Sequence, residues 1–425
     1  MYDTCCGIDF GTTNSAISVI NNDCPELINF HDKNTIPSAM FFPEGKITEP
    51  LFGNEAINQY INGEQGRFMR SLKRILGTDL MYLKTEVNGS CLSFEDIILR
   101  FIKYLKKTAE NKTNRELKNV VLGRPVHFQD FAPEADKNAE SLLRHIAINA
   151  GFKNVQFQYE PIAAAYAHEA KLNSEKLACV VDIGGGTSDF SIIRLNPKNS
   201  KKTDRKKDIL ANTGIRIGGN DFDRDLSIKC FMPELGYGTL LKPDEYTKQV
   251  LPVPSSPYVT LSEWSNINNL YTYREEKNIT QIYKKAAVPE KVRGLYEIVK
   301  KEQGHVMLNQ VEKTKIALSR KDMVETILSF LSYLPKIIIN KKEFEKSIYK
   351  DVEKIIESLK ECLQLAAIKD QAINLIVLTG GSSEIPYLKE RIKSIFPAAE
   401  LSEENKLASV AIGLSYDAAR IYKND

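Results

Sequence analysis

Apolar and polar residues alternate along most of the chain with two different periods. Short apolar runs at Asn119 to Leu122 and Val155 to Tyr159 have the length of strands. From Phe94 to Leu105 the apolar residues recur at helical spacing, and Ser93 with Asp96 resembles a capping box in front of them. Strands that alternate with helices in this way predict an α/β protein.

The second half of the chain continues this pattern. Apolar residues recur at helical spacing in Val311 to Leu318 and in a long stretch from Ile348 to Leu363, and Ile373 to Leu378 predicts a buried strand. The segment 236–304 differs, because it is rich in proline and tyrosine and holds the only tryptophan. We interpret it as an insertion that packs on the second of two units.

Two strand pairs enclose glycine-containing turns whose residues follow the same order. In the stretch Asp182 to Ser191, three consecutive glycines lie between the carboxylates Asp182 and Asp189. In the stretch Asp9 to Ser18, Asp9 is followed by a glycine and then by two threonines. Glycine lets the backbone approach a ligand, and the N–H groups of such a turn suit phosphate. The carboxylates favour Mg²⁺ beside that phosphate. Either stretch alone could be an ordinary hairpin turn, whereas the matched pair favours two related units.

The composition is that of an ordinary globular protein, with 42% hydrophobic and 27% charged residues among 425. Because 58 basic residues stand against 55 acidic ones, the net charge of +3 does not favour nucleic acid. The basic run from Lys198 to Lys207 lacks aromatic residues and predicts a solvated loop. Seven cysteines without a metal-ligand pattern predict reduced thiols, and no signal peptide or bilayer-spanning run is visible. We therefore expect a cytoplasmic protein that binds neither nucleic acid nor membrane.

Three motifs resemble those of the actin-like ATPase superfamily. They are Asp9-Phe10-Gly11-Thr12-Thr13-Asn14-Ser15, similar to the phosphate-one motif, Asp182-Ile183-Gly184-Gly185-Gly186-Thr187-Ser188-Asp189, similar to phosphate-two, and Leu378-Thr379-Gly380-Gly381-Ser382, similar to the adenosine motif. Three further stretches, Ser71 to Gly77, Tyr159 to Ala165 and Gly218 to Asp223, resemble the ATPase domain of DnaK-type heat-shock chaperones. The resemblance covers residues 4 to 420. The variants Arg216 to Asp221 and Gly123-Arg124-Pro125, with the insertion, resemble the short YegD-like branch that lacks a peptide-binding domain.

The resemblance implies a two-lobed actin-like ATPase fold of duplicated ribonuclease-H-like domains, each lobe a mixed sheet flanked by helices. Residues 1–172 and 403–425 would form lobe I, with the phosphate-one motif and the catalytic lysine. Residues 173–402 would form lobe II, with the other two motifs and the insertion at about 236–304. Since the chain ends at Ile421 to Asp425 with neither linker nor β-sandwich, we expect no peptide-binding domain.

The resemblance also implies ATP or ADP with Mg²⁺ as the cofactors. Lys73 would position the γ-phosphate and the attacking water, Glu160 and Asp182 would orient that water, and Thr187 would lie beside the γ-phosphate. Asp9 and Asp182 would hold water ligands of Mg²⁺. The nucleotide would be bound by a larger set of residues: Gly11, Thr12, Thr13, Asn14, Gly184, Gly185, Gly186, Gly218, Gly219, Glu312, Lys315, Ser319, Gly380, Gly381, Ser382 and Glu384.

Some of these residues also have ordinary structural interpretations. The stretch Phe68 to Gly77 predicts a short helix or helical turn, and Lys73 within it could be a surface lysine. Glu312 with Lys315 could be an exposed helical ion pair. Two positions depart from the family. Glu384 stands where the family has an adenine-stacking arginine, and a carboxylate cannot stack as a guanidinium does. Leu407 stands where the family has an acidic residue. Both departures bear on nucleotide affinity and base preference.

We therefore expect a slow ATPase that converts ATP and water to ADP and phosphate. Closure of the lobes on ATP would make it a two-lobe switch, acting alone or through a protein partner or co-chaperone docked on the lobes. Phosphoryl transfer to water needs charge neutralisation and an aligned nucleophile. Two alternatives stay open: a regulator that binds nucleotide without hydrolysis, and an actin-like filament-forming ATPase. A sugar kinase would need an acceptor base, and we identify none.

Overall fold

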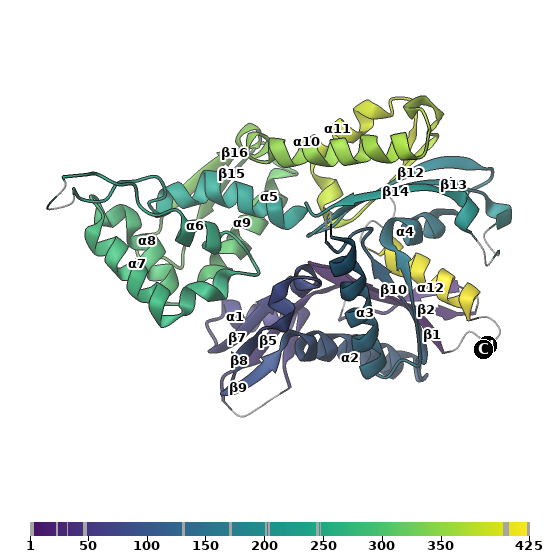
Figure 1. Ribbon diagram of the computed structural model, residues 1–425, viewed down its shortest axis with the longest axis horizontal. Helices are drawn as coiled ribbons and strands as arrows, with labels where there is room; N and C mark the ends of the chain where they lie inside the picture. Colours follow the sequence, from purple (N-terminus) through teal and green to yellow (C-terminus); the bar gives the residue numbers. More distant parts are fainter. Residues whose placement is uncertain are drawn as a thin grey trace. The chain divides into compact units, whose positions relative to one another are not determined.

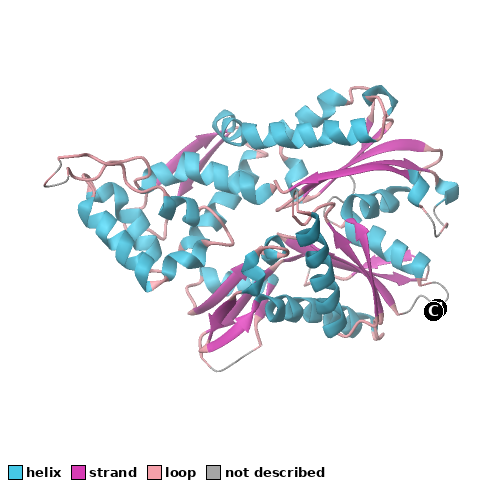
Figure 2. Cartoon of the chain, in the orientation of Figure 1, coloured by secondary structure: helices cyan, strands magenta, loops and turns pink. Residues whose placement is uncertain are grey.

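The computed structural model describes residues 4–22, 24–31, 33–45, 49–129, 132–169, 172–199, 202, 205–243, 246, 248–402 and 408–422. Helices and strands alternate along them (Figure 2), which confirms the predicted α/β class. The chain divides into two compact units. The first holds the residues up to Gly218, Lys354–Glu384 and the segment from Leu388 onward, and the second holds Gly219–Glu353 with Ile385–Tyr387.

The first unit contains two mixed sheets. In the first sheet the strand order is β11-β10-β1-β2-β3, with β4 paired to β2. Strand β10 is parallel to β1 and to β11, whereas β2 is antiparallel to β1 and β3. The strands are β1 (Cys5–Phe10), β2 (Asn14–Asn21), β3 (Cys24–Leu27), β4 (Ile36–Pro37), β10 (Asn119–Arg124) and β11 (Asn154–Tyr159).

The second sheet repeats the plan of the first. Its order is β14-β13-β12-β17-β18, with β17 parallel to β12 and β18, and with β13 antiparallel to β12 and β14. Its strands are β12 (Lys176–Ile183), β13 (Ser188–Leu195), β14 (Ile209–Ile215), β17 (Leu375–Thr379) and β18 (Glu400–Ser402). In both sheets, three neighbouring parallel strands are followed by two antiparallel ones, which confirms the duplication that the two matched turns predicted.

Two helices lie between these sheets (Figure 1). Helix α12 (Ser409–Ile421) packs on β1, β2 and β10, α4 (Glu160–Glu169) packs on β12 and β13, and the two helices contact each other. A Cβ on Gly413 would lie 1.7 Å from the carbonyl oxygen of Ala163. Only glycine therefore permits the helices to approach so closely, and their small residues complete a shared core with both sheets.

Helices α2 (Phe94–Thr113) and α3 (Pro133–Asn149) cover the other face of the first sheet. The predicted capping box at the start of α2 is confirmed, because the Asp96 amide donates to the Ser93 hydroxyl and the Ser93 amide donates to the Asp96 carboxylate. Smaller elements complete this part of the chain: β5 (Ala39–Pro43), β6 (Leu51–Phe52), α1 (Gly53–Ile61), β7 (Gly66–Arg70), β8 (Lys84–Val87) and β9 (Ser90–Ser93).

The second unit is mainly helical. Its elements are α5 (Gly219–Leu226), α6 (Ser256–Leu261), α7 (Tyr273–Lys285), α8 (Pro289–Lys300), α9 (Gly304–Leu318), β15 (Met323–Ile327) and β16 (Lys336–Asn340). Helix α10 (Lys341–Leu365) has residues in both units, and α11 (Pro386–Ile395) begins at the predicted proline. Trp264 and Tyr258, from the segment interpreted as an insertion, are buried. The predicted lobe boundaries stay a prediction.

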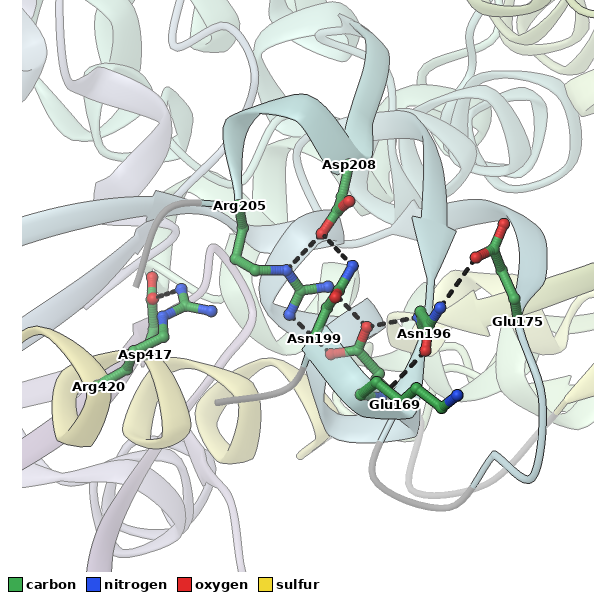
Figure 3. A network of polar contacts seen from close by, with 9 residues as sticks. Glu169, Glu175, Asn196, Asn199, Arg205, Asp208, Asp417 and Arg420 are labelled. Atoms are coloured by element: carbon green, nitrogen blue, oxygen red, sulfur yellow. Dashed lines mark hydrogen bonds and ion pairs between the residues drawn. The ribbon is translucent and has the colours of Figure 1, made fainter. Parts of the chain in front are cut away.

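A buried polar network in the first unit connects α4 to the residues before β14 (Figure 3). The Arg205 guanidinium donates to both carboxylate oxygens of Glu169, at 2.6 and 2.7 Å, and to Asp208 at 2.6 Å. The Asn196 amide also donates to Glu169, at 2.8 Å. Arg205 and Glu169 are almost fully buried, so each charge depends on the other for compensation.

Candidate functional site

The turn between β1 and β2 is tightly folded and is held by a neighbouring serine. A Cβ on Gly11 would lie 2.1 Å from the carbonyl oxygen of Asn14, so this position requires glycine. The Ser38 hydroxyl donates to Gly11 O at 2.7 Å, and the Ser38 amide donates to Thr13 O at 2.8 Å. Asp9 is the next-to-last residue of the preceding strand, beside this turn. The predicted phosphate-one residues therefore belong to one tight turn and to the strand ends that flank it.

The turn between β12 and β13 carries the second set of predicted residues. Asp182 and Asp189 are directly paired across the two strands. The Gly184 amide donates to Thr187 O at 3.0 Å, and the Ser382 hydroxyl donates to Gly184 O at 2.9 Å. A Cβ on Gly218 would lie 2.7 Å from the carbonyl carbon of Gly185. Side chain and backbone therefore fix this turn from two sides.

The two turns meet. A Cβ on Gly186 would lie 2.6 Å from the Thr12 hydroxyl oxygen and 3.1 Å from Cγ of Arg74. Gly380, which follows β17 with φ of +78°, approaches Asp182 so closely that a Cβ there would lie 2.7 Å from a carboxylate oxygen. The structure thus brings together three predicted motifs that are far apart in the sequence.

Lys73 lies at the same place, buried and paired with Glu160. It belongs to a short 3-10 helix, Leu72–Ile75, which Ser71 enters with a left-handed φ of +62°. The prediction of a helical turn is confirmed from Leu72, although β7 extends to Arg70 and so takes the first part of the stretch. The surface-lysine interpretation of Lys73 is wrong, since only 7% of the residue is exposed.

The carboxylates around Lys73 repel one another. Burial and then the Glu160 charge raise the pKa of Asp9 to about 7. Burial, Glu160, Asp189 and Asp9 raise the pKa of Asp182 well above its usual value. Burial lowers the pKa of Lys73, but the charges of Glu160 and Asp9 raise it further, so the net shift is upward. The site thus holds more negative charge than Lys73 offsets.

Asp189 is a further functional candidate: the sequence pattern paired it with Asp182 as a carboxylate that favours Mg²⁺, but it was not among the predicted catalytic, nucleotide-binding or metal residues. Its Oδ1 accepts the Val126 amide at 2.6 Å, and its buried Oδ2 has no hydrogen-bond partner. Burial and then Glu160 raise its pKa to about 7. Asp182 is the next-to-last residue of β12 and Asp189 is the second residue of β13, so the antiparallel pairing of the two strands makes their carboxylates direct neighbours.

A hollow opens where the turns meet. Its lining residues are Thr12, Lys73, Arg74, Pro125, Phe128, Gly186, Thr187 and Arg216. Four of them, Arg74, Pro125, Phe128 and Arg216, were not among the predicted site residues. Two of these four are arginines, so positive charges other than that of Lys73 also lie at this hollow.

The predicted nucleoside residues fall in both units. In the first unit Ser382 is buried against the phosphate-two turn, while Glu384 is exposed. In the second unit the Lys315 ammonium lies 2.7 Å from the Asp223 carboxylate and donates to Gly219 O at 2.9 Å, so its interpretation as part of an exposed ion pair is wrong. Glu312 and Ser319 are partly buried in this unit. Leu407 lies outside the described residues.

Within the part of the chain that the structure describes, no three His, Cys, Asp or Glu side chains gather so as to hold a metal ion directly. None of the described helices combines the length and the apolar composition that crossing a bilayer requires.

Comparison with known proteins places these observations in a family context. The model of the Hsp70 protein family matches residues 5–236 and 292–423. The chain is 26% identical over 424 residues to the chaperone protein DnaK of Mycoplasmopsis agalactiae (strain NCTC 10123 / CIP 59.7 / PG2), a match covering 97% of this chain and 58% of that protein. It is 28% identical over 423 residues to the chaperone protein DnaK of Thermosipho africanus (strain TCF52B), a match that covers 97% of this chain and 58% of that protein. The chain therefore spans less than two thirds of the length of these relatives.

Proposed function

We propose that this chain, which belongs to the Hsp70 protein family, binds ATP with Mg²⁺ where its two glycine-containing turns meet and slowly hydrolyses it to ADP and phosphate. The observation that carries the proposal is the buried Lys73–Glu160 ion pair at the meeting point of the turns, beside carboxylates with raised pKa. Backbone turns for phosphate, one cation and several carboxylates supply the positioning and charge that phosphoryl transfer requires.

The residues present fit Mg²⁺. Asp9, Asp182, Asp189 and Glu160 place four carboxylates around one ammonium group, and burial together with the Glu160 charge raises the pKa of each of the three aspartates. Asp9 and Asp182 would hold the ion through water, since carboxylate and water oxygens suit Mg²⁺. When bound, it would supply positive charge beside the phosphate oxygens.

The chain's own residues would act by orientation. Glu160 and Asp182 would hold the attacking water, and Lys73 would offset the charge of the terminal phosphate. Thr187 is partly buried at the end of its turn, and its hydroxyl would donate a hydrogen bond to the same phosphate. Thr12, Thr13 and the amides of 184–186 would bind the phosphate chain from both sides.

A regulator that binds nucleotide without hydrolysing it is the second candidate. This function applies if bound nucleotide leaves the ion pair intact, because Glu160 then stays engaged with Lys73 instead of orienting an attacking water. Placement in the short YegD-like branch and a protein partner or co-chaperone docked on the chain stay predictions. Chaperone activity is named for relatives of which this chain spans 57% to 58%, so it is also only a proposal for this chain.

Binding of ATP and ADP to the purified chain, with and without Mg²⁺, and release of phosphate in a single turnover test this function. We expect Mg²⁺-dependent binding and slow phosphate release, which Lys73→Ala and Asp182→Ala should each slow by about 100-fold. Lys84→Ala removes an exposed lysine of β8 and is the matched control. Binding without phosphate release would favour the regulator, and unchanged turnover in both active-site variants would overturn the mechanism.

A further inference from the structure

The backbone that carries Lys73 has little support of its own. The 3-10 helix Leu72–Ile75 spans four residues, and its turn is closed by only a few backbone hydrogen bonds, such as Arg74 N to Ser71 O at 3.1 Å and Leu76 N to Lys73 O at 3.2 Å. Hydrogen bonds in 3-10 helices have poor geometry, so such short helices depend on outside contacts. A lysine that must meet a phosphate within a fraction of an ångström needs firmer support.

Two side chains from outside supply that support. The Arg216 guanidinium donates from Nη2 to Arg74 O at 2.7 Å and from Nη1 to Gln129 Oε1 at 2.6 Å. Gln129 in turn donates from Nε2 to Leu76 O at 2.7 Å. The two carbonyls that flank Ile75 are therefore held by two side chains that also hold each other. We call this pair the Arg216–Gln129 clamp.

The clamp requires these two residue types. The Gln129 amide accepts from Arg216 and donates to a carbonyl, which a glutamate carboxylate cannot do because it only accepts. Arg216 donates to two acceptors at once from a planar fork, whereas a lysine ammonium is a single point donor. Arg216 can only donate and the Leu76 carbonyl can only accept, so the two contacts agree on which end of the Gln129 amide is the oxygen and which is the nitrogen.

The position of Arg216 connects the lysine to the phosphate turn. Arg216 directly follows β14 and lies two residues before Gly218, which packs against Gly185 in the β12–β13 turn. Arg74, whose carbonyl the clamp holds, also approaches Gly186 of that turn, and Arg216 itself lines the hollow with Lys73 and Thr187. A shift of the phosphate turn would therefore reach the Lys73 backbone through this clamp.

We propose that Arg216, oriented by Gln129, is a positioning residue that fixes the turn bearing Lys73 for hydrolysis of the terminal phosphate. The proposal rests on the proposed function, in which Lys73 acts on that phosphate. Loss of the clamp would displace Lys73 and so slow hydrolysis. Nucleotide binding would be kept, because the two turns that bind the rest of the nucleotide have hydrogen bonds of their own.

The test compares Arg216→Ala, Arg216→Lys and Gln129→Glu with the parent and with Arg194→Ala, which removes an exposed arginine of β13. For Arg216→Ala we expect kcat for ATP to fall by roughly 10- to 100-fold, with ADP affinity changed by less than about twofold, a difference of under ~0.5 kcal/mol. Guanidinium ion at low concentration should restore part of the activity of Arg216→Ala and none of that of Lys73→Ala, with sodium chloride as the ionic-strength control. A parent-like kcat, or an equal loss of ADP affinity, would overturn the proposal.

Hydrogen exchange of the nucleotide-free protein separates failure of this proposal from failure of the proposed function. Amides from 71 to 77 should exchange faster in Arg216→Ala and Gln129→Glu than in the parent, while those of β12 and β13 stay protected. If the parent binds ATP without hydrolysis, the ratio of ATP to ADP affinity replaces kcat and should fall in Arg216→Ala. Unchanged exchange in segment 71–77 would overturn the clamp whether or not the parent is an ATPase.

Discussion

Asp182 and Asp189 are direct neighbours across β12 and β13, and both are buried. Burial and then the Glu160 charge raise the pKa of both, and the Asp189 charge raises that of Asp182 further. Lys73 forms an ion pair with Glu160 beside the two aspartates. Because Lys73 is paired with Glu160, the two neighbouring aspartates mark the place where a cation such as Mg²⁺ would relieve the repulsion between carboxylates.

Removal of the metal should make nucleotide binding weak. If Mg²⁺ relieves the repulsion among the carboxylates, ATP at about 100 times its dissociation constant should stabilise the protein by roughly 2.7 kcal/mol when Mg²⁺ is present. Thermal unfolding with ATP, in Mg²⁺ and in excess chelator, measures the difference. Equal stabilisation by ATP in both conditions would contradict a role for the metal at this site.

Two glycines near the phosphate-two turn should differ in their tolerance of alanine. A Cβ on Gly218 would lie 2.7 to 2.9 Å from backbone atoms of Gly184, Gly185 and Gly186, whereas a Cβ on Gly184 would find its nearest neighbour 3.8 Å away. Backbone cannot move aside easily, so Gly218→Ala should lower the free energy of unfolding by about 1–3 kcal/mol. Gly184→Ala is the control, and urea denaturation without nucleotide should place it near the parent.

Breaking the buried network of Figure 3 should be costly. Arg205→Ala leaves the buried Glu169 carboxylate without its guanidinium, so we expect a loss of about 3–5 kcal/mol in the free energy of unfolding. Arg194→Ala, at an exposed pair with Glu175, should cost less than about 1 kcal/mol. The prediction fails if chemical denaturation gives both variants the same stability.

Asp225 in the second unit should give a distinct pH dependence. Burial and then the Asp351 charge raise its pKa to about 6, although Arg224 lowers it. Its unfolded pKa is about 3.9, so from about pH 4 to pH 6 the unfolded chain releases this proton first and the folded state loses stability as the pH rises. Asp225→Asn has no such proton and should gain about 2 kcal/mol relative to the parent across that window. Urea midpoints at both pH limits measure this gain, and a difference between the two proteins that is independent of pH would contradict it.

The sequence alone determined the local elements and the two phosphate turns. Strand, aspartate, glycine and strand are a contiguous pattern, so Asp9 and Asp182 could be placed near the ends of strands without tertiary information. The capping box at Ser93 was equally visible, because it depends on residues three apart. The repeated order of the turns also predicted the duplicated sheets.

Only the tertiary structure decided which side chains meet. Lys73 pairs with Glu160 across 87 residues, and Arg216 holds Arg74 across 142. Such contacts depend on how the sheets and helices pack, down to the single glycine that lets α12 approach α4. Periodicity encodes which face of an element is buried, but not which distant polar group shares that burial. That is why Gln129 and Arg216 enter the site only through the folded chain, and why the hydrogen bond from the Val126 amide to Asp189 could not be predicted.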